Sequence, residues 1–393
     1  MQKAHIPIIS TCRLLYDRIR LKLPPELYYI LTLFIITRII LTIIGTSSST
    51  LLNKGLIPFT DTAYRFLNIW GSWDSGWYFL IARDGYSPAI SAEATGKGMA
   101  NYGFFPGYPL LMRGVAFFTN SFFISGLIIS NVCLIISALF LYKLVRLESS
   151  VETARRAVKY LFLFPSAFIL SGVFSESLFL ALFIVSYYYA KRQEWYLCGI
   201  AGYCFALTRP NGVLMLASLL YEYAASRSFQ LKKFNLSILY LLLIPLGILT
   251  FMVFTFFLTG DLFAYCHVKI TGWHHRLSNP FMELYIFCRF SDQLEYVLNG
   301  WWTIIIIVVM TIFYKKLGFA YWLIGMLFSI ATVVNGPAVL TSMLRHTIGI
   351  FPFYILLAKL TEKKYTDDIV TIISALLQGF MMVFWSTGFR FIV

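Results

Sequence analysis

Asp74, Arg83 and Asp84 place two carboxylates and one guanidinium among aromatic residues in the stretch NIWGSWDSGWYFLIARDGY, at 68–86. A carboxylate can act as a base that removes the proton of an acceptor hydroxyl. Arginine matches the geometry of phosphate and stabilises the charge that forms on a departing phosphate group. These residue types suit the transfer of a group from a phosphate to a hydroxyl, provided that further cations reach Asp74.

Three other ionisable residues lie in otherwise apolar segments: Glu176, Arg209 and Arg345. A charge within a membrane segment costs about 2.5 kcal/mol or more, so each of these residues is a functional candidate by default. Arg209 is the first choice for binding a donor phosphate, with Arg345 and Arg276 behind it. A structural ion pair between Glu176 and Arg209 is the competing interpretation.

Residues near Asp74 also have structural interpretations. Asp74 is a good N-cap for a helix that begins at Ser75, and Arg83 with Asp84 suits a solvent-exposed pair. Tryptophan is enriched where a membrane meets water. The alternative interpretation of three residues is a position at the membrane–water interface: Trp70, Trp73 and Trp77.

The other polar residues show no clear chemical pattern. His274 and His275 lack the carboxylate spacing of a metal site, so no metal is expected. Cys266 and Cys288 fall in one predicted outer loop and could pair, although spacing alone does not decide it. Arg38, within the first apolar run, either snorkels or faces the bundle.

Composition defines the setting of these residues. The chain has 393 residues, 59% hydrophobic and 13% charged, whereas soluble domains have about 25% charged residues. Two runs, LYYILTLFIITRIILTIIG and LYLLLIPLGILTFMVFTFF, are long enough to cross a bilayer core of about 30 Å. The first is too long for a signal peptide and is expected to be an uncleaved span. We therefore expect an all-α integral membrane protein that forms one domain over 1–393.

The net charge of +14 does not indicate nucleic-acid binding, because the basic residues form short clusters between apolar runs. The positive-inside rule places these clusters on the cytoplasmic side. The clusters are Lys3, Arg13, Arg18, Arg20 and Lys22; Lys143, Arg146, Arg155, Arg156 and Lys159; Lys191 and Arg192; Arg227, Lys232 and Lys233; Lys315 and Lys316; and Lys359, Lys363 and Lys364.

This charge pattern predicts two short helical hairpins, 160–190 and 192–227, because the chain must leave and return between clusters. Their outer turns fall near Glu176 and Arg209, where neighbouring proline and glycine suit a break. Helices of about 14 residues span only about 21 Å. Both turns are therefore expected below the outer surface, where non-helical backbone must be buried by protein or line a cavity.

The rest of the chain completes a polytopic bundle. We expect about 11 spans in all, with the N-terminus inside and the C-terminus outside. The segment 104–118 is expected to be a re-entrant or interfacial helix within the first outer loop, 47–121, and 259–298 forms a second outer loop. The later spans are expected at 236–258, 300–314, 319–335, 338–358 and 366–388.

Four motifs occur in order: WDSGWYFLIARDGY at 73–86, NYGFFPGYPLLMR at 101–113, FPSAFILSGVFSESLFLAL at 164–182 and TRPNG at 208–212. Together they resemble the PIG-V family, GPI mannosyltransferase II, and its prokaryotic relatives in the GT-C glycosyltransferase superfamily. The matching family patterns are Trp-Asp-x-x-His-Phe-x-x-Ile-Ala-x-x-Gly-Tyr, Phe-Phe-Pro-x-x-Pro-Leu, Tyr-Ser-Glu and Arg-Ser/Pro-Asn-Gly. Any one motif alone is weak, but four in order are specific.

The resemblance implies a GT-C membrane enzyme that transfers mannose from dolichyl- or polyprenyl-phosphate mannose to a glycolipid acceptor, as in adding the second mannose of a GPI precursor. Asp74 matches the acidic base of the first outer loop, which acts in a single inverting displacement. No nucleotide sugar, metal or other cofactor is implied. The site would face the lumen of the endoplasmic reticulum or the outer side of a prokaryotic inner membrane. Further residues placed at the substrate site are Glu176, Asn211, Tyr102, Trp73 and Trp77.

Two departures from the family pattern leave the acceptor open. Trp77 stands where the family has histidine, and Phe174 stands where it has tyrosine. The need for a small accessory membrane subunit also stays open. The alternative from another class is a non-enzymatic transporter of lipid or lipid-linked sugar, which predicts polar residues at several depths rather than on one side.

Overall fold

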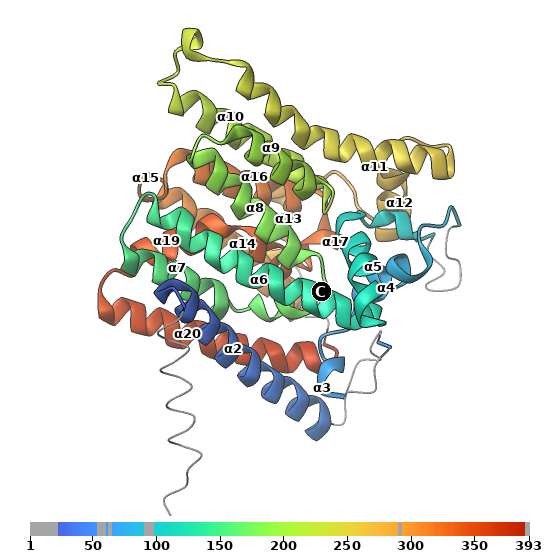
Figure 1. The fold of residues 1–393 in the computed structure, drawn as a ribbon. Helices are drawn as coiled ribbons and strands as arrows, with labels where there is room; N and C mark the ends of the chain where they lie inside the picture. Colours follow the sequence, from blue (N-terminus) through green and yellow to red (C-terminus); the bar gives the residue numbers. More distant parts are fainter. Residues whose placement is uncertain (1–22, 53–59, 62–64, 90–97, 290–292, 390–393) are drawn as a thin grey trace, which may run out of the picture.

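The structure is a computed structural model, and its described residues form only helices as regular elements, which confirms the all-α prediction (Figure 1). The basic cluster from Lys3 to Lys22 lies outside the described residues. So do parts of the first outer loop. The ranges that the structure describes are 23–52, 60–61, 65–89, 98–289 and 293–389.

Within the described ranges, five helices are long and apolar enough to cross a membrane. Shorter apolar helices, α9 (Trp195–Ala206) and α16 (Phe319–Val334), pack among them. The count of about 11 spans therefore stays a prediction. The five long helices are α2 (Pro25–Leu51), α6 (Phe122–Arg146), η5 with α11 (Leu236–Thr259), α14 (Leu294–Ile312) and α20 (Lys364–Ser386).

Both predicted segments hold two helices joined by a short turn, but the first unit begins at Val151 rather than at 160. In the first, α7 (Val151–Leu163) and α8 (Glu176–Lys191) are joined through the short helix η2 (Ala167–Ser171). In the second, α9 and α10 (Met215–Ser226) are joined through η3 (Pro210–Leu214). Each turn holds the expected ionisable residue, because Glu176 opens α8 and Arg209 immediately precedes η3.

The turn before α8 is recessed relative to the end of α6. With 16 residues, α8 extends only about 24 Å, less than a bilayer core of about 30 Å. The Ser130 hydroxyl donates a hydrogen bond to the Phe174 carbonyl at 3.4 Å. Ser130 lies about 12 Å along α6 from Phe122, where that helix begins. Glu176 is therefore well below the level at which α6 starts.

The segment 338–358 is not one continuous helix, and whether its broken pieces form the expected span stays a prediction. The helical pieces on either side of Ile350 meet at 80°. Pro352, at the start of the last piece, lacks the N–H that a continuous helix would need. Arg345 therefore lies in a broken segment, where it is buried. The pieces are α17 (Pro337–Leu340), α18 (Met343–His346), η6 (Thr347–Gly349) and α19 (Phe351–Leu360).

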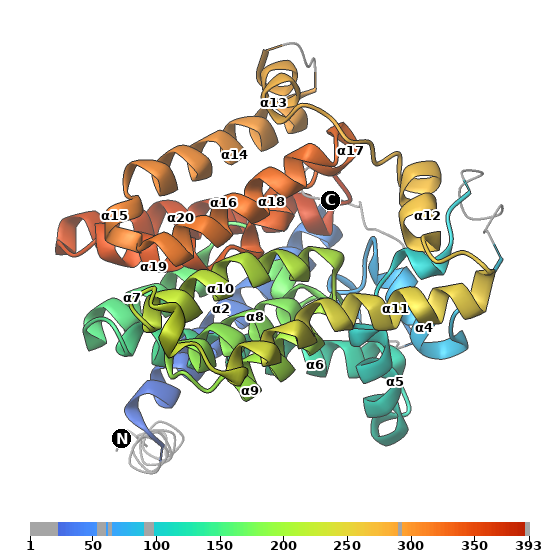
Figure 2. The same cartoon turned by 90° about the horizontal axis from the view of Figure 1, so that it is seen from above.

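The two predicted outer loops contain short helices that gather at one end of the bundle. Figures 1 and 2 both show α4, α5 and α12 together at that end. The predicted helix at 104–118 corresponds to α5, and its relation to a membrane stays a prediction. The helices of these loops are α3 (Arg65–Asn68), α4 (Ser75–Asp84), η1 (Asn101–Gly103), α5 (Gly107–Thr119), α12 (Ala264–Trp273) and α13 (Pro280–Arg289).

Basic residues from different clusters meet at the opposite end, near α7, α15 (Tyr314–Leu317) and α19 (Figures 1 and 2). Lys159 pairs with Asp367 at 2.6 Å. Lys191, at the end of α8, pairs with Glu148 and with Glu222, each at 2.8 Å. The described clusters therefore share one end, as the charge pattern requires, and the side of the membrane that this end faces stays a prediction.

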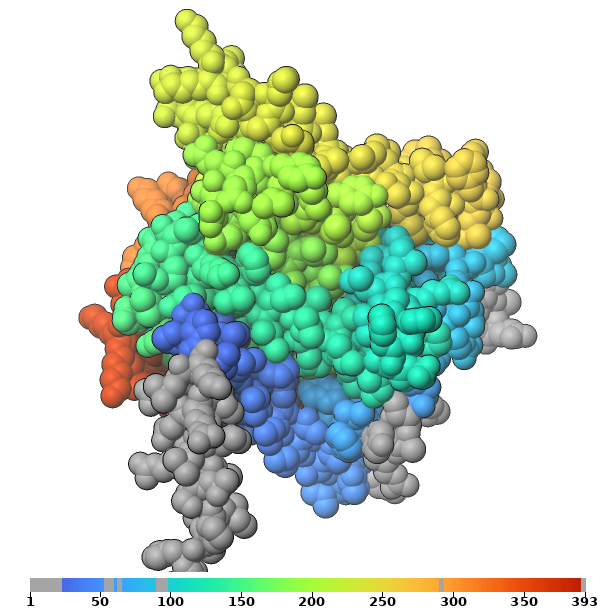
Figure 3. Space-filling model, viewed as in Figure 1, coloured from blue at the N-terminus to red at the C-terminus, as the bar shows by residue number. Residues whose placement is uncertain are grey.

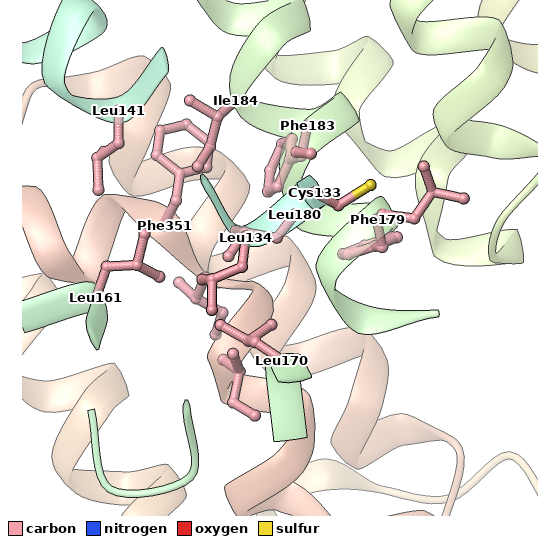
Figure 4. Packing of buried hydrophobic residues seen from close by; sticks show 14 of the residues in the cluster. Cys133, Leu134, Leu141, Leu161, Leu170, Phe179, Leu180, Phe183, Ile184 and Phe351 are labelled. Carbon is pink, nitrogen blue, oxygen red and sulfur yellow. The ribbon is translucent and has the colours of Figure 1, made fainter. Parts of the chain in front are cut away.

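Phe183 on α8 is the centre of the core that joins the hairpins to the later helices (Figure 4). Its ring stacks on Phe205 at 4.9 Å and on Phe328 at 5.1 Å, and meets Phe351 edge-on at 4.7 Å. Aromatic pairs of this kind contribute about 0.5–1.5 kcal/mol beyond area burial. This packing fixes the two recessed turns relative to α16 and α19.

Gly199 allows α9 and η5 to approach closely, and its replacement by alanine is expected to destabilise the fold. A Cβ at Gly199 would lie 2.2 Å from the Tyr240 carbonyl oxygen. We expect a loss of about 1–3 kcal/mol, as for other overpacked sites. Gly114→Ala is the matched control, because it meets no atom within 4 Å and should gain up to about 1 kcal/mol in helix propensity. Unfolding midpoints in detergent would test this, and equal midpoints for the two variants would contradict it.

Candidate active site

Asp74 stands at the start of α4, but its side chain does not cap the helix, so the capping interpretation is wrong. Its carboxylate instead accepts a hydrogen bond from Arg345 Nη1 at 2.6 Å and remains 27% exposed. The preceding residue, Trp73, has a φ of 57°. This left-handed conformation is strained for a bulky residue, and such strain clusters at functional sites. The carboxylate is both fixed in place and accessible.

Arg345 connects Asp74 to a second ion pair. Its Nε donates to the Glu176 carboxylate, and Arg209 Nη2 lies 2.5 Å from the same Glu176 oxygen. The Glu176 and Arg345 side chains are only 4% and 7% exposed. The ion pair considered for Glu176 and Arg209 is therefore present, but within a longer chain, Asp74–Arg345–Glu176–Arg209. This ionic chain pairs two anions with two cations, as buried charges require.

Ser175 and two aromatic rings hold the ionic chain in position. Arg209 Nε donates to the Ser175 hydroxyl at 3.3 Å, and Ser175 also shares a hydrogen bond with the Tyr78 hydroxyl at 2.8 Å. The Arg345 guanidinium lies 4.7 Å from the centre of the Phe174 ring, a favourable cation–π distance. Phe174, which departs from the family's tyrosine, therefore packs against the central arginine.

Lys269 on α12 brings a third cation to this end of the molecule, one that the sequence did not single out. Its Nζ lies 4.1 Å from the Trp273 ring centre and 4.8 Å from that of Phe104. Phe104 in turn stacks on Trp77 at 5.5 Å. Within the described part of the chain, no carboxylate forms a salt bridge with Lys269. Its ammonium is held by aromatic rings instead.

Burial lowers the pKa of Lys269 to about 8, although the nearby charge of Asp74 opposes this. The positive charges of Arg345 and Arg209 act in the same direction as burial. The rings of Phe104 and Trp273, which hold Lys269, also pack on Trp77, three residues after Asp74. Lys269 is thus a cation that an anionic ligand would stabilise.

The sequence around Lys269 carries a signal for this site. Tyr265, Lys269 and Trp273 are spaced by four residues, so on a helix they share one face. The ring centres of Tyr265 and Trp273 are 5.9 Å and 4.1 Å from Lys269 Nζ. A cation between two aromatic residues at this spacing indicates a cation–π site on a helix.

The other predicted site residues lie around the ionic chain or away from it. Arg276 is 67% exposed and faces Glu283 at 3.5 Å, so the structure does not bring it to Asp74. Tyr102 is buried in a small cluster with Val268. Asn211 is half-buried in η3, close to Arg209 in sequence.

The structural interpretations of the neighbouring residues have mixed outcomes. Arg83 and Asp84 form an exposed pair at 2.8 Å, as that interpretation predicts. Trp70 is buried in the core, and Trp77 is half-buried in the aromatic group beside Lys269. Neither is an exposed belt residue.

Histidines and cysteines of the second outer loop form neither a cluster nor a bridge. Among the described residues, no group of three or more His, Cys, Asp and Glu side chains could hold a metal ion. Cys266 and Cys288 are both free thiols. Burial, with the nearby charge of Lys269, lowers the pKa of His275 to about 4.

Comparison with known proteins gives distant likeness to solved structures alone. No family model matches the chain, and no curated protein matches it. Among solved structures, the chain is similar to the oligosaccharyltransferase of Archaeoglobus fulgidus, whose crystal structure holds a disulfide-tethered acceptor peptide with the NVT sequon. The TM-score is 0.46 at 13% identity, covering 93% of this chain and 55% of that chain. This chain thus spans about half of that protein's length, and any functional proposal must stand on its own residues.

Proposed function

We propose that this chain is a membrane glycosyltransferase that moves mannose from a polyprenyl-phosphate donor to a lipid-linked glycan acceptor. The observation that carries the proposal is the partly exposed Asp74 carboxylate, held by Arg345 at a recessed turn with Lys269 nearby. The site around Asp74 combines a base, cations and a position below the outer end of α6. A water-soluble donor would not need such a recess, whereas a lipid donor would.

Asp74 would act as the base in a single displacement. As the acceptor hydroxyl oxygen attacks the anomeric carbon, Asp74 takes the hydroxyl proton and the bond from that carbon to the phosphate oxygen breaks. Polyprenyl phosphate leaves with the bonding electron pair. The displacement inverts the anomeric configuration, which suits the conversion of a β-phosphomannoside into an α-mannoside without a covalent intermediate.

Lys269 replaces Arg209 as our first candidate for the donor phosphate. Arg209 and Arg345 are both committed to Glu176 in the structure. Lys269 has no such pairing within the described residues and is held near Asp74 by aromatic rings. A fixed cation near the leaving group stabilises the charge that develops in the transition state.

Turnover with defined lipids tests the proposed reaction. Purified protein in detergent would be incubated with polyprenyl-phosphate mannose, with and without a panel of glycolipid acceptors. We expect release of polyprenyl phosphate and formation of a mannosylated lipid only when an acceptor is present. Failure to turn over with every acceptor, together with movement of the donor across sealed vesicles, would instead support the transporter alternative.

Donor binding is expected to weaken as the pH rises through about 8, because Lys269 then loses its charge. Loss of one charge-assisted contact should raise the donor dissociation constant about tenfold. Binding would be measured without acceptor, so that the base plays no part. His275, with a pKa of about 4, stays neutral throughout this range.

Lys269→Arg is the control for the pH effect. Arginine keeps its charge across this range, so the variant should bind the donor with little change between pH 7 and pH 9. A wild-type dissociation constant that does not change with pH, or a pH effect that persists in the variant, would remove Lys269 from phosphate binding.

A further inference from the structure

A groove of about 330 Å³ lies between α2 and α6, separate from Asp74 and the ionic chain. Figures 1 and 3 show these two helices side by side on one face of the molecule. The groove is lined mostly by apolar side chains, with Arg38 and Thr42 from α2, Asn131 from α6 and Ser171 from η2 as polar exceptions. The groove therefore combines apolar walls, which suit a lipid chain, with a single cation.

Arg38 has no anionic partner among the described residues. The residue is only 9% exposed. Its Nη1 donates to the Ser171 hydroxyl at 2.7 Å and to the Ala167 carbonyl at 3.4 Å, whereas Nη2 is buried without a hydrogen-bond partner. No carboxylate forms a salt bridge with Arg38 within the ranges that the structure describes. A buried guanidinium with no counter-ion is costly, so this position favours an anionic ligand.

The exposed faces of the two helices that flank the groove indicate where that ligand comes from. On α2, Ile35 and Ile39 are 52% and 54% exposed, and on α6, Ile128 and Val132 are 43% and 49% exposed. Both helices are long and apolar enough to cross a membrane. Exposed branched aliphatic side chains at these positions face lipid rather than water, so the groove opens toward the bilayer.

We propose that this groove binds the phosphate of an anionic phospholipid, with its acyl chains along the apolar walls. Arg38 lies about 10 Å along α2 from Gly45, the end of the apolar run. Local thinning of the bilayer allows a headgroup to reach a cation at such a depth. The bound phosphate would supply an anion to the guanidinium at the groove wall while Nη1 keeps its contacts with η2. The site is independent of the proposed sugar transfer, because it contains neither Asp74 nor its partners.

Lipid-dependent thermal stability of the full chain in detergent tests this site. Phosphatidylglycerol should raise the unfolding midpoint in a saturable way, more than phosphatidylcholine does, because a ligand that binds the folded state stabilises it. Arg38→Met should weaken the apparent affinity about tenfold or more. Equal stabilisation by the two lipids, or an equal effect of inorganic phosphate alone, would overturn the proposal.

Two tryptophan variants keep the test decisive if Arg38→Met does not fold. Ile128 lines the groove, so Ile128→Trp should block the lipid effect while the contacts of Arg38 with η2 remain. Val132 is similarly exposed, lies one turn further along α6 and does not line the groove. Val132→Trp should keep the full effect, and identical responses of the two tryptophan variants would contradict the assignment.

Discussion

Asp74→Asn is expected to reduce sugar transfer by about 10²–10⁴-fold, the range over which a general base contributes. Asparagine has the same shape but cannot accept the proton of the acceptor hydroxyl. Its amide oxygen can still accept the hydrogen bond from Arg345 Nη1, which is 2.6 Å from the carboxylate. The variant should therefore still fold and bind the donor, with a smaller loss of stability than Glu176→Gln, because the Asp74 side chain is 27% exposed. The measurement is the single-turnover rate of mannose transfer alongside the donor dissociation constant.

Asp84→Asn is the matched control for this experiment. Asp84 lies at the other end of α4, is 56% exposed and pairs only with exposed Arg83 among its described neighbours. Surface pairs of this kind contribute little to stability, and Asp84 has no place in the proposed reaction. Its substitution should change the rate by less than about twofold. If Asp74→Asn retained a rate similar to that of Asp84→Asn, Asp74 would not be the base.

Sequence reasoning located the recessed turns because topology signals are local. Each short hairpin lies between two basic clusters, and the chain between them is too short for two full spans. Glu176 and Arg209 therefore had to emerge on the same side, and the structure pairs them at 2.5 Å. Their meeting follows from chain direction alone and requires no knowledge of side-chain packing.

The role of Arg345 could not be predicted from the pattern of basic clusters. An apolar run such as 338–358 is consistent with a straight helix, and proline is tolerated in membrane helices when neighbours satisfy the freed backbone groups. The 80° break depends on packing against α8 and α16, which periodicity does not encode. Only after the break is known does Arg345 fall between Asp74 and Glu176.

Lys269 illustrates a second limit on predicting the site from the sequence. It lies far along the chain from the motif at 73–86, in a loop with no span to fix its direction. The fold of that loop over Phe104 and Trp77 is a tertiary contact. The spacing with Tyr265 and Trp273 indicated a cation–π face but not which part of the protein it would approach.

Glu176→Gln is expected to destabilise the fold by about 3–5 kcal/mol, as when one partner of a buried ion pair is removed. The variant leaves Arg345 and Arg209 close together with only Asp74 to balance them. The Glu176 side chain is 4% exposed, so water offers little compensation. Equilibrium unfolding in mixed micelles would measure the change.

Adding Arg209→Gln to Glu176→Gln should recover part of the lost stability, because the second change removes one of the two unbalanced cations. Asp74 and Arg345 would then remain as a single pair at 2.6 Å. Residues that share such a network show interaction energies of about 0.5–3 kcal/mol in double-mutant cycles. Arg209→Gln alone leaves Glu176 paired with Arg345 and should cost less than Glu176→Gln. Strictly additive losses in the double variant would show that the two residues do not stabilise each other, and the four-residue ionic chain would then be an incorrect description of the site.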